Sequence, residues 1–233
     1  MYIQHVIDHT VVLRDMPEGV RAALAEAGKV RRYRKGEYLW RAGDREDGLH
    51  LVGEGIVHIG NIGPDGDEIV LHVVGPGGCT GEPGIYAPEG DRRTNARAVE
   101  RTTIVMIPSD AVRAALETSL EAMRIFTRRV SEICRSHARR VALTAFHDAR
   151  GRLARLLLDL AETHGVPTAG GCRIELPLSQ RTLAGLVSVR REHVNRIVAE
   201  LESEGAIRFE DGTVTVLKES ALRAALGLEA SLP

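Results

Sequence analysis

The sequence predicts an α+β protein with three parts in chain order: a β-roll of jelly-roll type, one long helix, and a small domain of helices that ends in a hairpin. Residues from about 20 to 108 contain short β-branched runs between recurring glycines, which is typical of a barrel or jelly roll. Residues 119–147 contain neither glycine nor proline, so they can form one helix. Two short amphipathic helices and a hairpin pattern follow over 179–216.

Composition is that of an ordinary soluble globular chain of 233 residues, with 43% hydrophobic and 27% charged residues. No apolar run approaches the ~18 residues that a membrane span needs, and the first ten residues lack the pattern of a secretory signal. Cys79, Cys134 and Cys172 lie far apart without a CxxC pair. We therefore expect a reducing cytoplasm, no disulfide framework and no cysteine-ligated iron–sulfur cluster.

The β part has its clearest signal between residues 56 and 74. The runs IVHIG (56–60) and EIVLHVV (68–74) indicate two strands, and Asp65-Gly66 between them predicts a hairpin turn, because such turns need positive φ. The basic run 29–35 is expected to be a solvated surface. Ser109 and Asp110 then provide a cap signal for a short helix over 109–117.

The long helix over 119–147 carries a repeating pattern at spacings of three and four, which is one seam of a coiled coil. The seam residues are Leu120, Met123, Thr127, Val130, Cys134, His137, Val141 and Thr144. A helix of this length with such a seam needs a partner, and the economical interpretation is the same helix of a second subunit in a parallel homodimer. The alternative is a long helix that packs only on its own β domain.

A boundary follows the long helix. The run DARGRL (148–153) contains a glycine and predicts a hinge at 148–151. Residues 152–165 indicate a helix that ends at Gly165, and VPTAGG (166–171) indicates a loop.

The segment 179–205 has the most specific pattern in the chain. Ser179 is expected to cap a first short helix and Ser188 a second one. The apolar inner faces consist of Leu183, Leu186, Val187, Val194, Ile197, Val198 and Leu201. The opposite face of the second helix groups Arg191, Glu192, Asn195 and Arg196.

Two short helices joined by a tight turn, with a polar face on the second, predict a helix-turn-helix that binds double-stranded DNA. Arginine can donate two hydrogen bonds to guanine, glutamate can accept one from cytosine, and asparagine can pair with adenine. Arg181 and Arg190 add positive charge for phosphates. The candidate DNA-binding residues are Ser179, Gln180, Arg181, Ser188, Arg190, Arg191, Glu192, Asn195 and Arg196.

A β-hairpin is predicted directly after the helix pair, over 206–216. Ile207 and Phe209 alternate inward, Asp211-Gly212 forms the turn, and Val214 and Val216 return. This hairpin is interpreted as the wing of a winged helix. An amphipathic helix pair with mere surface charge is the alternative, and the wing argues against it.

With these residues placed, the chain resembles the CRP/FNR superfamily of bacterial transcription regulators over nearly its whole length. Arg191, Glu192 and Arg196 match the family's Arg-Glu-x-x-x-Arg recognition pattern. The resemblance implies a cyclic-nucleotide-binding-like β-roll and a homodimer on a palindromic site with TGTGA-like or TTGAT-like half-sites. It also implies contact with RNA polymerase if the protein is an activator. The expected domains are an effector-sensing β-roll (1–117), a dimerisation helix (118–147) and a winged helix-turn-helix (148–233).

The resemblance also implies an effector site around the run 81–98. In relatives that bind cyclic AMP, a Gly-Glu-Leu-Gly turn contacts the ribose, and an Arg-Ser or Arg-Thr pair holds the phosphate. Here the turn is Gly81-Glu82-Pro83-Gly84, with proline where leucine is usual. The implied effector-binding residues are Gly81, Glu82, Arg92, Arg93, Thr94 and His137.

Two departures from the family pattern lie in that set. Without gaps, Arg92 takes the arginine place and Arg93 the hydroxyl place, whereas a shift of one residue gives an Arg93-Thr94 pair and requires a bulge. On the long helix, cyclic-AMP binders place a Thr-Ser pair that reaches the adenine, and the matching positions here are His137 and Ala138.

The identity of the effector stays open at this point. A cyclic nucleotide such as cyclic AMP could use Glu82 and one of the two arginines, or Glu82 could form an internal salt bridge in a pocket that no longer binds a ligand. Haem is a less favoured cofactor, because no metal-binding motif is visible. Its candidate ligands are His5, His9, His72, His137 and Cys134. Thiol sensing through Cys134 or Cys79 is weaker still.

Two other classes of function compete with the regulator. One is a cyclic-nucleotide-binding module that acts through protein contacts and carries a degenerate helix-turn-helix, against which the polar face at 191–196 argues. The other is an enzyme, for which no nucleophile–base pair, metal motif or phosphate loop is visible.

Overall fold

A computed structural model of the chain describes residues 1–63, 68–87 and 90–226. The chain divides into two compact units. The first comprises Met1–Asn61 and Leu71–His137, and the second comprises Ile62–Val70 and the chain from Ala138 onward. The predicted turn at Asp65-Gly66 lies outside the described residues. Within the described ranges, no helix has the length and apolar character needed to cross a membrane.

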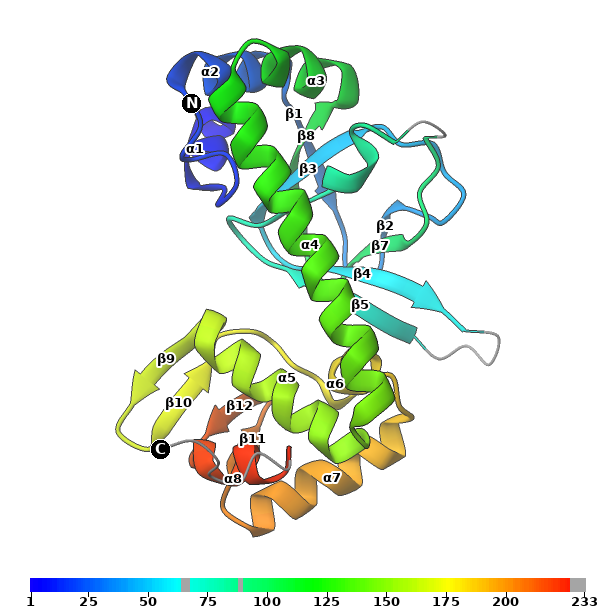
Figure 1. Cartoon of the computed structure of the whole chain (residues 1–233), viewed down its shortest axis with the longest axis vertical. Helices are drawn as coiled ribbons and strands as arrows, with labels where there is room; N and C mark the ends of the chain where they lie inside the picture. The colour runs from blue at the N-terminus through cyan, green and yellow to red at the C-terminus, as the bar shows by residue number, and fades with distance from the viewer. Residues whose placement is uncertain (64–67, 88–89, 227–233) are drawn as a thin grey trace. The chain divides into compact units, whose positions relative to one another are not determined.

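Two four-stranded sheets form the β-roll of the first unit (Figure 1). One has the order β1-β8-β3-β6, with strands Lys29–Tyr33, Thr102–Pro108, Gly48–Glu54 and Cys79–Thr80. The other has the order β2-β7-β4-β5, with strands Tyr38–Trp40, Asn95–Ala98, Val57–Ile62 and Glu68–Val74. The runs predicted at 56–60 and 68–74 are therefore strands. The basic run 29–35 lies largely on β1, whose residues are mostly exposed.

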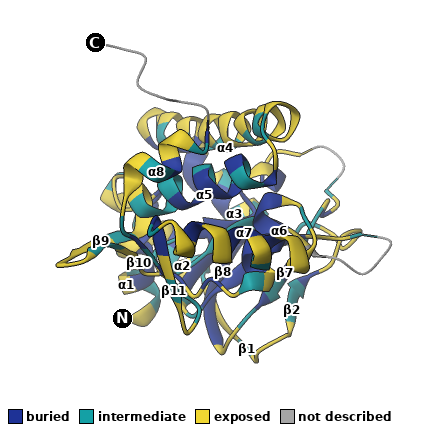
Figure 2. Ribbon diagram, turned by 90° about the horizontal axis from the view of Figure 1, so that it is seen from below, coloured by how far each residue is buried: buried dark blue, intermediate teal, exposed yellow. Residues whose placement is uncertain are grey.

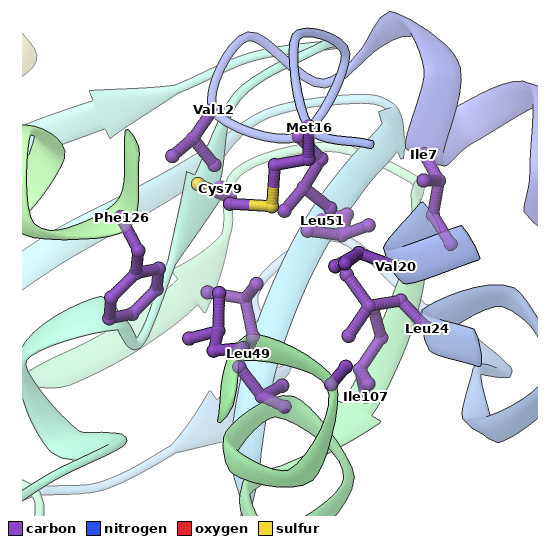
Figure 3. Close-up of a cluster of buried hydrophobic side chains, with 14 of the residues drawn as sticks. Ile7, Val12, Met16, Val20, Leu24, Leu49, Leu51, Cys79, Ile107 and Phe126 are labelled. Carbon is purple, nitrogen blue, oxygen red and sulfur yellow. The ribbon is translucent and has the colours of Figure 1, made fainter. Parts of the chain in front are cut away.

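Two apolar clusters hold this unit together. The first joins side chains from both sheets: Trp40, Val52, Val57, Ile59, Ala96 and Ile104. The second packs three helices, α1 (Tyr2–His9), α2 (Glu18–Ala27) and α3 (Ser109–Glu117), against the sheet that contains β3 and β8 (Figure 3). Phe126 from the following helix completes this second cluster.

The short helix α3 has the predicted bounds, but its cap differs from the prediction. Pro108 occupies the N-cap position, and no side chain caps the helix. Neither Ser109 nor Asp110 acts as the cap, because both already lie inside the first turn. Proline tolerates this junction because its missing N–H is one that a helix start leaves unpaired.

Helix α4 (Leu120–Phe146) is the long helix that the sequence predicts. Its buried residues are Ala122 and Phe126 in the first turns. Most of the helix is exposed (Figure 2). Of the seam residues, Leu120 and Val141 are 68% and 71% exposed, and Met123 and Val130 are half-buried. Met123 and Val130 pack against the second cluster, whereas the seam positions Leu120, Cys134 and Val141 remain exposed.

The second unit combines four helices with a small sheet. The helices are α5 (Ala149–His164), α6 (Gln180–Val187), α7 (Arg191–Ser203) and α8 (Glu219–Ala224). The sheet has the order β11-β12-β10-β9, with strands Ile207–Glu210, Thr213–Val216, Gly171–Ile174 and Gly165–Thr168. The fold class predicted from the sequence is confirmed.

One local prediction in the second unit is wrong, and the boundary predicted after the long helix lies at the start of its run but is not made by the glycine. The segment 166–171 is not a loop, because most of it belongs to the hairpin of β9 and β10, which extends the wing sheet through β12. Gly151 does not interrupt the helix: it lies buried inside α5, which Asp148 caps by accepting from the Gly151 backbone N–H at 2.8 Å. The break between α4 and α5 is at His147–Asp148.

Candidate DNA-binding helix and effector pocket

The turn between α6 and α7 sets the position of the second helix. Ser179 caps α6 as predicted, since its Oγ accepts from the Thr182 backbone N–H at 3.1 Å. Ser188 does not cap α7. It takes a left-handed conformation (φ 56°) at the end of α6, and the N-cap of α7 is Arg190. The chain needs this left-handed residue to reverse direction, so the second helix begins at Arg191.

Helix α7 has one buried and one exposed face. Val194, Ile197, Val198 and Leu201 are all buried, and Leu183, Leu186 and Val187 of α6 are buried with them, as predicted. On the opposite face the structure leaves Arg191, Glu192 and Arg196 exposed. Asn195 is half-buried, and its Oδ1 atom has no hydrogen-bond partner among the described residues.

The side chains on the exposed face of α7 are available to bind the bases of a DNA duplex. Within the described chain, the side chains of Arg191, Glu192 and Arg196 make no hydrogen bond or ion pair. An α-helix fits the major groove, where two arginine forks and a carboxylate can distinguish base edges. Among the other residues predicted to bind DNA, Gln180 is half-buried. The exposed ones are Ser179, Arg181, Ser188 and Arg190.

The wing has the turn that the sequence predicts. Asp211 and Gly212 both have positive φ, 49° and 76°, as the mirror-image two-residue turn requires. The Phe209 backbone N–H donates to Glu202 Oε1 at 2.8 Å, which ties the wing to α7. Val214 and Val216 are buried beneath it.

Helix α7 is also tied to α5 through charge. Arg150 Nη2 lies 2.6 Å from Glu204 Oε2, and Nη1 lies 3.3 Å from Glu200 Oε2. The hydrogen bond to Glu204 is the main reason that the pKa of Arg150 is raised. This clamp was not visible in the sequence, because the partners lie about fifty residues apart.

The predicted Gly-Glu-Pro-Gly turn is a short 3-10 turn (Glu82–Gly84) preceded by Gly81 with φ 99°. Glu82 is only 3% exposed and already has two partners. Arg129 of α4 donates from Nε to Glu82 Oε1 at 3.0 Å, and the Cys79 thiol donates to the same oxygen at 3.2 Å. Burial opposes the Arg129 charge, but the Glu82 carboxylate outweighs it and raises the pKa of Arg129.

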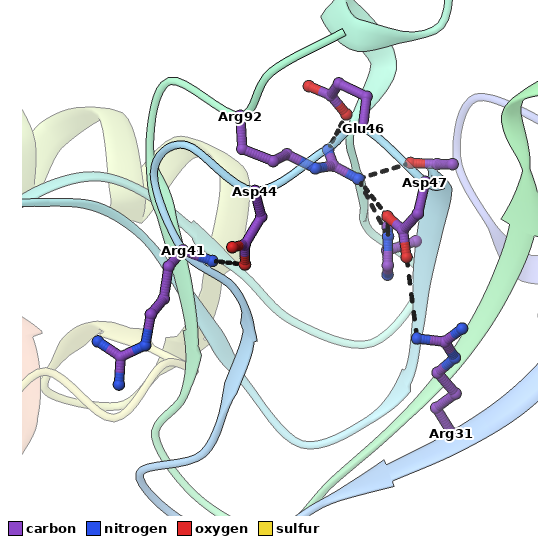
Figure 4. A network of polar contacts seen from close by, with 8 residues as sticks. Arg31, Arg41, Asp44, Glu46, Asp47 and Arg92 are labelled. Atoms are coloured by element: carbon purple, nitrogen blue, oxygen red, sulfur yellow. Dashed lines mark hydrogen bonds and ion pairs between the residues drawn. The ribbon is translucent and has the colours of Figure 1, made fainter.

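Arg92 is the second polar centre of this site (Figure 4). It is 3% exposed, and its guanidinium lies 3.9 Å above the ring centre of Trp40. Nη1 lies 2.5 Å from Glu46 Oε2, and Nη2 lies 2.7 Å from Asp47 Oδ1. Nη2 also donates to the Gly48 carbonyl at 3.1 Å. Two carboxylates and an aromatic ring therefore surround the guanidinium.

The titratable neighbours of Arg92 are shifted by this packing. Burial raises the pKa of Glu46, although Arg92 pulls in the opposite direction. Burial also pushes the pKa of Asp47 upward, but hydrogen bonds and charge from His50 and Arg92 outweigh it and hold that pKa well below its usual range. Burial lowers the pKa of His50, whose Nε2 lies 2.9 Å from Asp47 Oδ1. A cluster of one cation and one firmly ionised carboxylate results.

The turn and the Arg92 cluster are in close contact. A Cβ on Gly84 would lie 2.1 Å from the Glu46 carboxyl carbon, and a Cβ on Gly81 would lie 2.5 Å from the Gly48 carbonyl oxygen. The two glycines thus permit an approach that side chains would block. The Glu46 carboxylate occupies the space between the turn and the arginine.

The two adjacent arginines, Arg92 and Arg93, lie in different environments. Arg92 points into the cluster, whereas Arg93 is exposed and Thr94 is half-buried. This is the arrangement of the ungapped register. His137 is exposed on α4, and its Nε2 lies 2.8 Å from Nε2 of His72 on β5.

Among the other proposed cofactor ligands, His5 and His9 lie on α1 with ring centres 4.1 Å apart. No described group of three or more His, Cys, Asp or Glu side chains is placed to hold a metal ion. All three cysteines are free, and burial raises the pKa of Cys79 well above its usual value, followed in effect by the Glu82 charge.

Sequence reasoning missed Trp40, Glu46, Asp47, His50 and Arg129, which provide most of the contacts to Arg92 and Glu82. The sequence contains little that points to these residues as parts of the site. The acidic run Asp44–Asp47 between two glycines is the one local hint, and the partners come from strands and a helix far apart in the sequence.

Two family models match the chain. Residues 30–119 match the cyclic nucleotide-binding domain, and residues 151–225 match the Crp-like helix-turn-helix domain.

Curated relatives match most of the chain. A CRP-like cAMP-activated global transcriptional regulator of Mycobacterium tuberculosis is 32% identical over 78% of this chain and 81% of its own length. The cyclic AMP receptor protein of Thermus thermophilus is 30% identical over 88% of this chain and 91% of its own length. The anaerobic regulatory protein of Bacillus subtilis is 25% identical over 85% of this chain and 84% of its own length.

Solved structures share the fold. A CRP-family transcriptional regulator from Thermus thermophilus matches with a TM-score of 0.67 at 26% identity, covering 86% of this chain and all of its own. FixK2 from Bradyrhizobium japonicum matches with a TM-score of 0.75 at 19% identity, covering 88% of this chain and 99% of its own, which speaks for the fold alone.

Proposed function

Because the chain belongs to the CRP/FNR family of transcription regulators, we propose that it acts as a homodimer that binds a palindromic DNA site and responds to an effector through its β-roll. The chain is a DNA-binding regulator with an effector domain, and its family regulates transcription rather than catalysing a reaction. The proposal adds the dimer, the operator and the effector site, and it places the protein in the cytoplasm, which its three free cysteines support.

One observation carries the DNA-binding proposal: α7 buries one face and leaves Arg191, Glu192 and Arg196 exposed without internal partners. These residues are proposed to read TGTGA-like or TTGAT-like half-sites in the major groove. Ser179, Gln180, Arg181, Ser188, Arg190 and Asn195 are proposed to support that contact through phosphates or neighbouring bases.

The exposed seam positions of α4, Leu120, Cys134 and Val141, support the dimer. Two parallel α4 helices would bury Leu120 and Val141 and set the two recognition helices roughly 34 Å apart, one turn of DNA. We propose that the chain has the three domains expected from the sequence. The boundary between the dimerisation helix and the winged helix-turn-helix then lies at His147–Asp148, where α4 ends. An effector would shift the packing of the α4 pair and so reorient the winged helices about this junction. An activator would in addition contact RNA polymerase.

The DNA proposal is tested by selecting sites from a random duplex library and measuring affinity at fixed salt. Arg191→Ala and Arg196→Ala should each lose roughly 1–3 kcal/mol of discrimination at one base pair of the half-site. Arg173→Ala, an equal charge change at an exposed position of β10 in the same unit, serves as the control. Unchanged sequence preference in both α7 variants would show that α7 does not read bases.

A cyclic nucleotide is the proposed effector class, because several relatives are named cAMP-activated and the Gly81-Glu82 turn lies against the Arg92 cluster. The proposed contacts are Gly81, Glu82, Arg92, Arg93, Thr94 and His137. Binding would require the phosphate to replace Glu46 beside Arg92.

A second candidate is a regulator that binds its operator without a cyclic nucleotide. The observation in its favour is that Arg92 and Glu82 already have internal partners, Glu46 with Asp47 and Arg129 respectively. Operator binding measured with and without cyclic AMP and cyclic GMP separates the two. Tighter binding with either nucleotide supports the first candidate, and equal binding together with no calorimetric heat supports the second.

A further inference from the structure

His72 and His137 bring two imidazoles together on the surface of the first unit. Nε2 of His72 on β5 lies 2.8 Å from Nε2 of His137 on α4, and the ring centres are 5.0 Å apart with planes tilted by 36°. The two residues are 65 positions apart in the sequence, so the fold rather than local chain geometry brings them together.

We propose that His72 and His137 are ligands of a divalent transition-metal ion of the zinc class. A zinc ion holds imidazole nitrogens at roughly 2.0–2.1 Å, so two ligands at a right or tetrahedral angle lie about 2.9–3.4 Å from each other. The observed separation needs an adjustment of only a few tenths of an ångström. Imidazole is a ligand suited to zinc, copper, nickel and iron.

The same distance argues against haem at this place. Two histidines on opposite sides of a haem iron would hold their nitrogens roughly 4 Å apart, twice the metal–nitrogen distance. At 2.8 Å the two nitrogens, which are within hydrogen-bonding distance when no ion is bound, are too close to take opposite sides of one haem iron.

Two ligands do not complete a zinc site, and no described group of three ligands exists in one chain. The missing ligands come from a second copy of the chain. His137 is a seam residue, and seam residues of parallel helices face their symmetry mates. This step rests on the proposed homodimer. The dimer would place two His72–His137 pairs across the two-fold axis and offer four imidazoles to one ion.

The pair on α1 provides a matched comparison. His5 and His9 also have close rings, but both sit on one helix, and Nδ1 of His9 lies 2.8 Å from the His5 carbonyl oxygen. A double variant of this pair removes two imidazoles from the chain, one more than either single variant of the proposed site, without touching that site.

The experiment uses tag-free, full-length protein stripped of metal and titrated with Co²⁺, then with Zn²⁺ as a competitor. We expect visible absorption of tetrahedral Co²⁺ at one ion per two chains, and its loss when Zn²⁺ is added. His72→Gln and His137→Gln should each abolish the absorption, whereas the double variant His5→Gln with His9→Gln should keep it. Unfolding of the metal-free variants checks that each is folded.

Sedimentation of the same samples distinguishes a failure of the proposed metal site from a failure of the proposed homodimer. A dimer that binds no ion, or whose His72→Gln and His137→Gln variants bind Co²⁺ as well as the parent, overturns the metal site and leaves the proposed regulator intact. A monomer that binds one ion per chain overturns the shared site and the homodimer together. A dimer with one ion that depends on both histidines supports the inference.

Discussion

Nη1 of Arg92 lies 2.5 Å from Oε2 of Glu46, and this ion pair fills the space beside the Gly81–Gly84 turn. Both side chains are largely buried, at 3% and 14% exposed. A ligand phosphate that binds Nη1 has to displace the Glu46 carboxylate. The pair therefore acts as an internal competitor for any anionic effector.

Neutralising this competitor should strengthen nucleotide binding. In Glu46→Gln the side chain keeps its shape but loses the charge that would repel a phosphate, so we expect cyclic AMP affinity to rise by about tenfold or more. Isothermal titration calorimetry measures the effect. Glu26→Gln, which removes an exposed charge on α2, is the control. Equal affinity of Glu46→Gln and the parent would mean that no phosphate binds at Arg92.

Removing the arginine should instead destabilise the β-roll. Arg92→Ala leaves Glu46 and Asp47 close together without their cation, and breaking a buried ion pair costs about 3–5 kcal/mol. Because Asp47 is 38% exposed, we expect the low end of that range. Urea unfolding gives the free energy. Arg93→Ala, at the exposed neighbouring position, should stay within about 0.5 kcal/mol of the parent. Similar losses in both variants would contradict this role of Arg92.

Oxidation should cross-link the proposed dimer through Cys134. This thiol is exposed on the α4 seam, where parallel helices bring equivalent residues close enough for a disulfide. Treatment with diamide should give a covalent dimer on a non-reducing gel. The dimer band should disappear in Cys134→Ser and persist in Cys172→Ser. A band that persists in Cys134→Ser, or none in the parent, would contradict a parallel seam.

Mild acid should weaken the fold through His50. Burial lowers its pKa, so the folded ring takes up a proton only at a lower pH than the unfolded chain, which does so below about pH 6.5. The stability is present above that pH and is lost as the pH falls below it. The free energy of unfolding of the parent should therefore fall more steeply between about pH 7.5 and 5.5 than that of His50→Gln. Parallel pH profiles would show that His50 is not responsible.

Local chemistry explains why parts of the fold could be predicted. Asp211-Gly212 has few ways to turn, so the wing was visible in the sequence, and the apolar spacing of α7 fixed its buried face. The β9–β10 hairpin was missed because Val166 and Pro167 give no strand signal of their own. Their pairing depends on β12, which comes more than forty residues later.

The effector site was harder to predict from the sequence than the fold, for a related reason. Glu82 and Arg92 could be found from the family pattern, but their partners could not. Arg129 lies on α4, and Glu46 lies in a loop before β3, so each contact depends on how separate elements pack. Ser188 shows the same limit on a smaller scale, since a capping residue and a left-handed turn residue can have the same sequence signature.

The stacking of Arg92 on Trp40 has a practical consequence. Trp40 is the single tryptophan of the sequence and is 6% exposed, so the intrinsic fluorescence of the protein comes largely from one ring that touches the guanidinium. Any event that moves Arg92 changes the electric field at that indole. The unlabelled protein thus carries an optical reporter inside its effector domain, and a stopped-flow trace of its emission would time the exchange of Glu46 for a ligand.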